Sequence, residues 1–176
     1  MTSRGMSSPR PAGDGASDPH DVARAIVLQQ LTMAPRSRRH LEDKLAAKGC
    51  DEQVSKVVLD RMQDVGLVDD AAYAGMLVRS QQVGRGLARR ALAQELRRKG
   101  VDDDVAQEAL EQIDDESERA RAHALVAKKM RSMHGLDALV QTRRLAGMLA
   151  RKGYSSSMSW SVIREAVADA PEHQRD

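Results

Sequence analysis

The sequence predicts an all-α protein built from three tandem three-helix repeats in an elongated, curved array, and three observations lead to this fold class. Strong helix formers dominate the 176 residues, whereas the aromatic residues are only two Tyr and one Trp. The pattern Leu-x-x-Lys-Gly occurs three times, at Leu45–Gly49, Leu96–Gly100 and Leu149–Gly153. Apolar residues between these corners recur at helical spacing, as in Val22 and Ile26.

The two ends of the chain differ in composition from the rest. Residues 1–20 are rich in Ser, Pro and Gly without an apolar segment, so we expect a disordered tail there and no secretory signal. Residues 170–176 are expected to form a C-terminal tail. No stretch approaches the roughly 20 apolar residues of a membrane span. The single Cys50 excludes an internal disulfide and a multi-cysteine zinc site. We therefore expect a cytoplasmic protein with no membrane contact.

Each predicted repeat consists of an opening helix, a middle helix and a third helix after the Lys-Gly corner. The opening helices are expected at residues 21–33, 69–83 and about 115–133, from i,i+4 pairs such as Tyr73 and Leu77. The repeats themselves are expected to span residues 21–65, 69–113 and 115–169. A unit of this size buries little surface alone, so stacking of the units is the expected source of stability.

The three corners share the chemistry of a helix ending before another begins. A glycine there can take the left-handed conformation that closes a helix, and the preceding lysine faces the negative end of the helix dipole. An apolar residue follows, then a residue that can cap the next helix. The match extends further: a leucine lies four residues before the leading leucine, and an arginine lies six before it, at Arg39, Arg90 and Arg143. This agreement indicates an internal repeat.

Basic residues concentrate on the predicted middle helices, although the whole chain carries a formal charge of only +2. The third helices are acidic, most strongly over residues 102–118. We expect the basic side chains to contact either phosphates or the carboxylates of a partner. The alternatives are a solvated face and a structural brace for each repeat. The candidate contact residues are Arg38, Arg39, Arg89, Arg90, Arg97, Arg98, Lys99, Arg143, Arg144 and Arg151.

The sequence lacks the patterns expected of an enzyme. It has neither a Gly-x-x-x-x-Gly-Lys-Ser/Thr phosphate loop nor a His-Glu-x-x-His motif, and its five His residues do not have metal-ligand spacing. Cys50 and Trp160 are expected to be packing and core residues. We therefore expect no catalytic site, no metal and no cofactor. The acidic third helices also argue against a helix that reads DNA bases in the major groove.

Two long segments of the sequence resemble the RecX family of bacterial recombination regulators. They are "SRRHLEDKLAAKGCDEQVSKVVLDRMQDVGLVDDAAYAGMLVRS" and "GLARRALAQELRRKGVDDDVAQEAL", with a weaker continuation through "RRLAGMLARKGYSSSMSWSVI". The most specific pieces are "GLVDDAAYA" at 66–74 and "ELRRKG" at 95–100, in this order and at this spacing. Ala91 departs from the pattern, because the family commonly has a β-branched residue there.

The resemblance implies a function as well as a fold of three three-helix repeats. Proteins of this family bind the RecA recombinase and its filament on single-stranded DNA, and they inhibit its ATPase, strand exchange and coprotease activities. The implied processes are DNA repair, homologous recombination and the SOS response. We expect a monomer that contacts the RecA filament through the basic residues above, with direct contact to DNA phosphates as a second expectation. Two alternatives stay open: a helical DNA-binding regulator acting without RecA, and a helical protein-interaction scaffold.

Overall fold

The computed structural model describes residues 17–169, and within that range every regular element is an α-helix. The helices are α1 (Pro19–Met33), α2 (Arg38–Ala47), α3 (Glu52–Asp64), α4 (Asp70–Arg85), α5 (Arg89–Arg98), α6 (Asp103–Glu111), α7 (Asp115–Met130), α8 (Ala138–Arg151) and α9 (Ser156–Ala168). The predicted tail residues 1–16 and 170–176 lie outside the described residues. The all-α prediction is confirmed.

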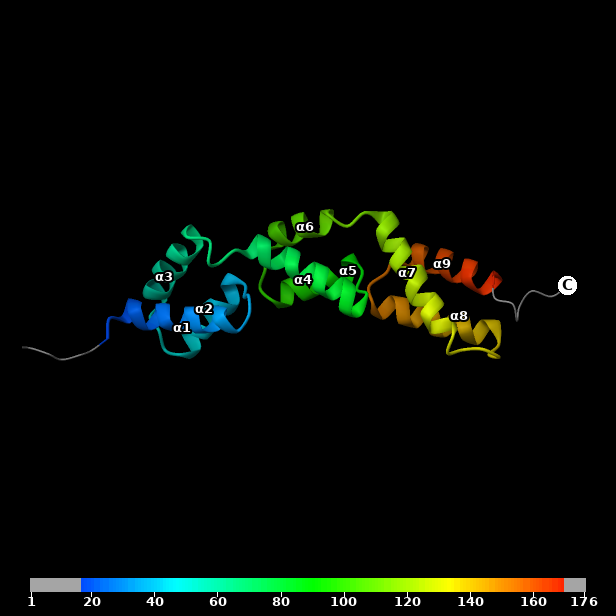
Figure 1. The fold of residues 1–176 in the computed structure, drawn as a ribbon, viewed down its shortest axis with the longest axis horizontal. Helices are drawn as coiled ribbons and strands as arrows, with labels where there is room; N and C mark the ends of the chain where they lie inside the picture. The colour runs from blue at the N-terminus through cyan, green and yellow to red at the C-terminus, as the bar shows by residue number, and fades with distance from the viewer. Residues whose placement is uncertain (1–16, 170–176) are drawn as a thin grey trace, which may run out of the picture.

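The helices form three units that follow one another along the long axis of the molecule (Figure 1). Unit 1 contains α1–α3, unit 2 contains α4–α6, and unit 3 contains α7–α9. The helix pairs with the most extensive contacts all lie within one unit, such as α1 with α3 and α7 with α9. The molecule is therefore elongated, and its units meet through small joints.

Each unit has its own buried apolar cluster around the repeated leucines. The two leucines of the repeat pattern are fully buried in every middle helix, as predicted: Leu41, Leu45, Leu92, Leu96, Leu145 and Leu149. Burying a leucine side chain contributes roughly 1.5–3 kcal/mol, so these six positions fix the middle helices within their units. Cys50 packs against the unit 1 cluster, as expected for a packing residue.

The helix boundaries differ from the predicted ones by a few residues. The first helix begins at Pro19, inside the segment predicted to be a disordered tail, because the Asp18 side chain accepts a hydrogen bond from the His20 N–H at 2.8 Å and caps the helix. The opening helix of unit 3 ends at Met130 rather than at residue 133, and Met133 is nevertheless buried. Within residues 17–169, no helix is long and apolar enough to cross a membrane.

Candidate functional site

The three Lys-Gly corners close α2, α5 and α8 with the same backbone geometry. The glycines have positive φ values of 76° at Gly49, 75° at Gly100 and 86° at Gly153. The next N–H donates back to the carbonyl of the corner leucine, at 3.0 Å in unit 1 and 3.1 Å in units 2 and 3. This double turn satisfies carbonyls that a helix end leaves open. The predicted helix-ending corners are confirmed.

Two of these corners dock on the start of the middle helix of the preceding unit. Gly100 lies so close to α2 that a Cβ placed on it would be 2.5 Å from the Cβ of Arg39. Gly153 lies equally close to α5, where a Cβ would be 2.5 Å from the backbone nitrogen of Ala91. The corner carbonyls also accept hydrogen bonds: Lys99 O from the Ser37 hydroxyl, and Lys152 O from the Ala88 N–H at 2.9 Å.

The middle helices therefore succeed one another end to end, and we call α2, α5 and α8 the middle-helix row (Figure 1). The C-terminal end of α5 lies against the N-terminal end of α2, and the end of α8 lies against the start of α5. Their dipoles consequently run head to tail. With 10, 10 and 14 residues, the three helices contribute roughly 50 Å of length at 1.5 Å per residue.

A carboxylate from the opening helix of the next unit completes each joint. The Arg38 N–H donates to Asp70 Oδ1 at 2.8 Å, and the Arg89 N–H donates to Glu118 Oε1 at 2.7 Å. Each bond satisfies one of the N–H groups that a helix start leaves without a partner. Burial raises the pKa of Asp70, and the hydrogen bond from the Arg38 N–H opposes part of that rise.

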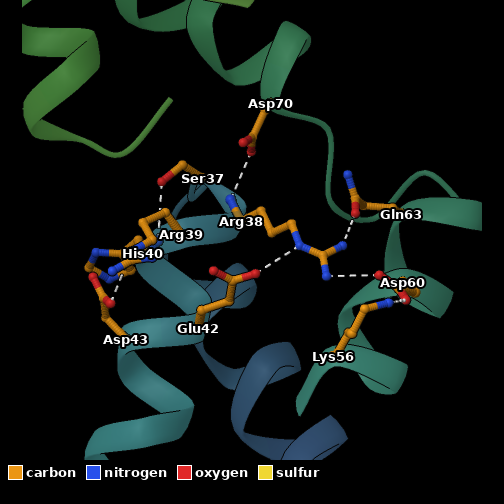
Figure 2. Close-up of polar contacts among 10 residues, drawn as sticks. All are labelled: Ser37, Arg38, Arg39, His40, Glu42, Asp43, Lys56, Asp60, Gln63 and Asp70. Carbon is orange, nitrogen blue, oxygen red and sulfur yellow. Dashed lines mark hydrogen bonds and ion pairs between the residues drawn. The ribbon is translucent and has the colours of Figure 1, made fainter. Parts of the chain in front are cut away.

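The Arg38 side chain points into its own unit rather than outward (Figure 2). Its guanidinium binds Glu42 at 2.9 Å on α2 and Asp60 at 2.8 Å on α3, and it also donates to the Gln63 amide. The side chain is only 21% exposed. Lys56 and Arg38 both lower the pKa of Asp60, with Lys56 contributing more. Arg38 thus joins α2 to α3. For this residue the contacts support the alternative of a structural brace.

Arg89, at the equivalent position of unit 2, also acts as a brace, although it reaches into the next unit. Its guanidinium binds Asp115 at the start of α7 and lies 3.7 Å from Glu118. The corresponding residue of unit 3 is Thr142, which has no guanidinium to make such a brace.

Several other candidate residues are exposed but have an acidic partner. Arg39 reaches Asp43 at 3.3 Å with both side chains about two-thirds exposed, and Arg97 reaches Asp103 at 3.3 Å. Such exposed pairs contribute at most about 1 kcal/mol and are readily exchanged for another partner. Arg98 binds Glu95 at 2.5 Å, and Arg85 binds the same carboxylate at 3.1 Å. These two arginines lower the pKa of Glu95, with Arg98 contributing more.

The remaining candidate cations are exposed and make no side-chain hydrogen bond or ion pair with another described residue. They are Arg90, Lys99, Arg143, Arg144 and Arg151. Arg90 lies on α5, Lys99 lies at the corner that closes α5, and the other three lie on α8. Arg90 and Arg143 occupy the equivalent position in successive units. The row therefore carries positive charge that the fold itself does not neutralise.

The expectation that Trp160 belongs to the core is wrong. Its side chain is 50% exposed on α9, whereas Ser159, Val162 and Ile163 form the buried face of that helix. The repeat register contained the signal, because Trp160 lies eleven residues after Leu149, where the other units have Lys56 and Gln107. A position that is polar in two copies is a surface position in the third.

No group of three or more His, Cys, Asp and Glu side chains in residues 17–169 could hold a metal ion. Among the histidines, His123 pairs with Glu165 at 3.2 Å, and His20 lies beside its helix-capping Asp18. His40 lies close to the first joint, where burial and the nearby Arg36 lower its pKa. These histidines have the structural or surface roles expected of them, and His173 lies outside the described residues.

Comparison with known proteins agrees with the three-unit division. The first, second and third three-helix domains of RecX match residues 23–62, 69–110 and 116–163. The regulatory protein RecX of Streptomyces lividans is 48% identical over 160 residues, covering 91% of this chain and 85% of that protein. The regulatory protein RecX of Mycolicibacterium smegmatis is 43% identical over 173 residues, covering 94% of this chain and 92% of its own length.

Solved structures show the same fold. The crystal structure of RecX from Lactobacillus salivarius superposes with a TM-score of 0.77 over 84% of this chain and 96% of that one, at 22% identity. A second crystal structure of a regulatory protein RecX gives a TM-score of 0.75 at 25% identity, covering 84% of this chain and 74% of that one.

Proposed function

The chain belongs to the RecX family, and from this premise we propose that it inhibits RecA by lying along the RecA filament with its middle-helix row. As a RecX regulatory protein, it is a non-enzymatic modulator of the RecA recombinase. The proposed activity is inhibition of ATP hydrolysis, strand exchange and coprotease function on single-stranded DNA. The proposed setting is DNA repair, homologous recombination and the SOS response in the bacterial cytoplasm, with a monomer as the acting species.

The observation that carries this proposal is the unneutralised charge on a row with a repeating contact. Arg90 and Arg143 occupy equivalent positions on α5 and α8, and both are exposed without an acidic partner. Arg39 is the equivalent residue on α2, where its guanidinium makes an exposed ion pair with Asp43. A body with regularly spaced cations can engage regularly spaced sites on a polymer, so weak contacts combine into a strong one.

The geometry divides the ten candidate residues into two roles. The Arg38 side chain joins α2 to α3 through Asp60, and Arg89 joins α5 to α7 through Asp115, so we propose that both residues position the row. The docking contacts fall to the exposed cations, which are Arg39, Arg90, Arg97, Arg98, Lys99, Arg143, Arg144 and Arg151. Solvent-exposed charge of this kind is screened by salt, so filament binding should weaken as ionic strength rises.

Hydrolysis of ATP by RecA on single-stranded DNA provides the test. The wild-type protein should inhibit hydrolysis, and the double variant Arg90→Glu/Arg143→Glu should need roughly a hundredfold higher concentration, because each reversal removes an attraction and adds a repulsion. The matched control is Lys128→Glu/Arg131→Glu, which reverses two exposed cations at the end of α7, outside the row. Circular dichroism should show that both double variants are folded. If they then inhibited hydrolysis equally, the middle-helix row would have no part in the inhibition.

A further inference from the structure

Three cations surround a histidine at the first joint. Burial lowers the pKa of His40, and the charges of Arg36, Lys44 and Lys99 lower it further. Such an effect between side chains falls off with distance, so the three cations lie near the imidazole. Arg36 lies just before α2, Lys44 lies one turn after His40 on that helix, and Lys99 comes from the corner that closes α5. We call these four residues the joint basic cluster.

The three cations of the joint basic cluster are not neutralised by the fold. Arg36, Lys44 and Lys99 make no ion pair with another residue in the described part of the chain. The acidic group that acts against their charges is Asp43 on α2. Its carboxylate already pairs with the Arg39 guanidinium at 3.3 Å (Figure 2). The cluster therefore keeps a net positive charge at the boundary between two units.

Two buried nitrogen atoms of the same cluster lack a hydrogen-bond partner among the described residues. They are Arg36 Nε and His40 Nε2. Buried polar atoms are nearly always paired in folded proteins, and an unpaired one is often explained by an ion or a water molecule that binds there. Burial raises the pKa of Tyr73 on α4, and Arg36 opposes part of that rise, so Arg36 also faces unit 2.

The second joint has different side chains at the same repeat positions. Leu87, Ala91 and Glu95 take the places of the three cluster residues that unit 1 contributes. Glu95 binds Arg85 at 3.1 Å, and the corner lysine of this joint, Lys152, donates to the Arg85 carbonyl. A joint can therefore form without a basic cluster, so the cations of the first joint are free for another role.

We propose that Arg36, Lys44 and Lys99 bind a phosphate group beside His40 at the first joint. Phosphate is the anion that suits these donors, because a guanidinium offers it paired N–H bonds and each lysine adds a compact positive charge. The group could be carried by a free phosphate compound or by the backbone of single-stranded nucleic acid, since both present the same oxygens. This site goes beyond the proposed function, because RecA takes no part in it.

The titration of His40 reports on the bound phosphate directly. Proton NMR of the imidazole groups should be recorded against pH for the full chain at low salt, with His40→Ala used to assign the signal. An anion beside the ring favours the imidazolium, so inorganic pyrophosphate should raise the His40 pKa by about 1. Because that pKa is raised on binding, the ligand should bind more tightly as the pH falls through it.

A second titration with an oligothymidylate distinguishes the two sources of phosphate. A raised His40 pKa with pyrophosphate alone assigns the site to a free phosphate compound. A raised pKa with the oligothymidylate alone assigns it to the nucleic-acid backbone, and a rise with both shows that either can bind. If neither probe changes the pKa of His40, the inference is overturned.

Charge variants test whether the cluster itself makes the site. Lys44→Gln/Lys99→Gln removes two exposed cations and should weaken binding of the active probe at least about tenfold in isothermal titration calorimetry. The matched control, Lys128→Gln/Lys129→Gln, removes two exposed lysines of α7 and should bind like the wild type. Equal affinities for the two double variants would overturn the inference, because the probe would then respond only to total charge.

A triple variant gives the first joint the residues of the second. Arg36→Leu/His40→Ala/Lys44→Glu should fold, since the second joint accommodates the same side chains, and it should no longer bind the probe. Binding that persists in the folded triple variant would overturn the inference. The exposed double variant Lys44→Gln/Lys99→Gln decides the question if the triple variant does not fold.

Inhibition of RecA-catalysed ATP hydrolysis, measured with the same wild-type preparation, reports on the proposed function separately. If the wild type inhibits hydrolysis but neither probe changes the pKa of His40, the phosphate site is refuted and the proposed function stands. If a probe raises that pKa and Lys44→Gln/Lys99→Gln binds it more weakly, the phosphate site is supported whether or not hydrolysis is inhibited.

Discussion

The two joints between the units are built from equivalent elements, yet their contacts differ. At the first joint the Ser37 hydroxyl donates to the Lys99 carbonyl. Asp70 accepts from the Arg38 N–H there (Figure 2), as Glu118 accepts from the Arg89 N–H at the second joint. At the second joint Ala88 replaces Ser37 and is buried within the apolar cluster of unit 3. The Tyr154 hydroxyl also donates to the Gly86 carbonyl at 3.1 Å.

The buried cluster of unit 3 therefore includes Ala88 from the start of α5, whereas the cluster of unit 1 includes no residue of α4–α6. The buried cluster of unit 1 ends with Val68, and that of unit 2 begins with Tyr73. Leu125 of α7 also lies against the end of α4, at Gly86. Because apolar burial contributes more than exposed polar contacts, units 2 and 3 should behave as one body, and unit 1 should separate from them more easily.

The largest loss of unfolding free energy is expected from Gly153→Ala, with Gly49→Ala as the matched control. Both glycines have a positive φ at the same kind of corner, which an alanine tolerates at a cost of about 1–2 kcal/mol. A Cβ on Gly49 meets nothing within 4 Å, whereas one on Gly153 meets the Ala91 backbone at 2.5 Å. Gly153→Ala should therefore lose about 3 kcal/mol or more of unfolding free energy, measured by urea denaturation.

The comparison between the joints would fail if the two alanine variants lost the same unfolding free energy. Gly100→Ala should also lose more unfolding free energy than Gly49→Ala, because its Cβ would be 2.5 Å from the Cβ of Arg39. The Arg39 Cβ is fixed by the α2 backbone, so a change of rotamer does not relieve this clash.

Tyr154→Phe should give a smaller loss, specific to the second joint. It removes the bond to the Gly86 carbonyl and leaves that acceptor buried, which costs about 1–2 kcal/mol of unfolding free energy. Burial also raises the pKa of Tyr154 from 10.0 to about 12. A pKa raised on folding means that this stabilisation is complete below pH 10 and is lost as the pH rises toward 12.

Unfolding free energy measured across this pH range provides the check. The wild type should lose stability steeply between pH 10 and 12, and Tyr154→Phe should lose less over the same interval. Parallel pH profiles for the two proteins would show that the buried phenol does not hold the joint.

The smallest effect is expected from substitutions of Asp70 at the first joint. Asp70→Ala leaves the Arg38 N–H without its acceptor and should cost about 1 kcal/mol of unfolding free energy. Asp70→Asn keeps an acceptor oxygen and removes the carboxylate, whose pKa is raised by burial. This variant should therefore leave the unfolding free energy nearly unchanged at pH 7. Because that pKa is raised, the wild-type joint should become more stable as Asp70 is protonated in acid.

Urea denaturation at pH 7 and at pH 4 tests both expectations, with Asp70→Asn expected to be less sensitive to pH than the wild type. A loss for Asp70→Asn as large as that for Asp70→Ala would mean that the charge, and not the hydrogen bond, holds the first joint.

The sequence was sufficient to predict what is local, because helix ends and buried faces follow from short-range spacing. The corners at Gly49, Gly100 and Gly153 and the buried leucines are of this kind. The joints could not be predicted, since the bond between Arg38 and Asp70 joins residues 32 positions apart. Adjacent arginines consequently looked alike in the sequence, although Arg38 is a brace and Arg39 is exposed. Trp160 was wrongly expected in the core because the expectation followed its neighbours in the sequence. The equivalent positions in the other units, which are polar, were not used.

The most direct test of the account measures affinity for a preassembled RecA filament as cations of the row are reversed one unit at a time. The series Arg143→Glu, Arg90→Glu/Arg143→Glu and Arg39→Glu/Arg90→Glu/Arg143→Glu should weaken binding about tenfold at each step, because each unit contributes its own contact. Lys128→Glu/Arg131→Glu should leave the affinity unchanged. Undiminished binding by the folded triple variant would contradict the account.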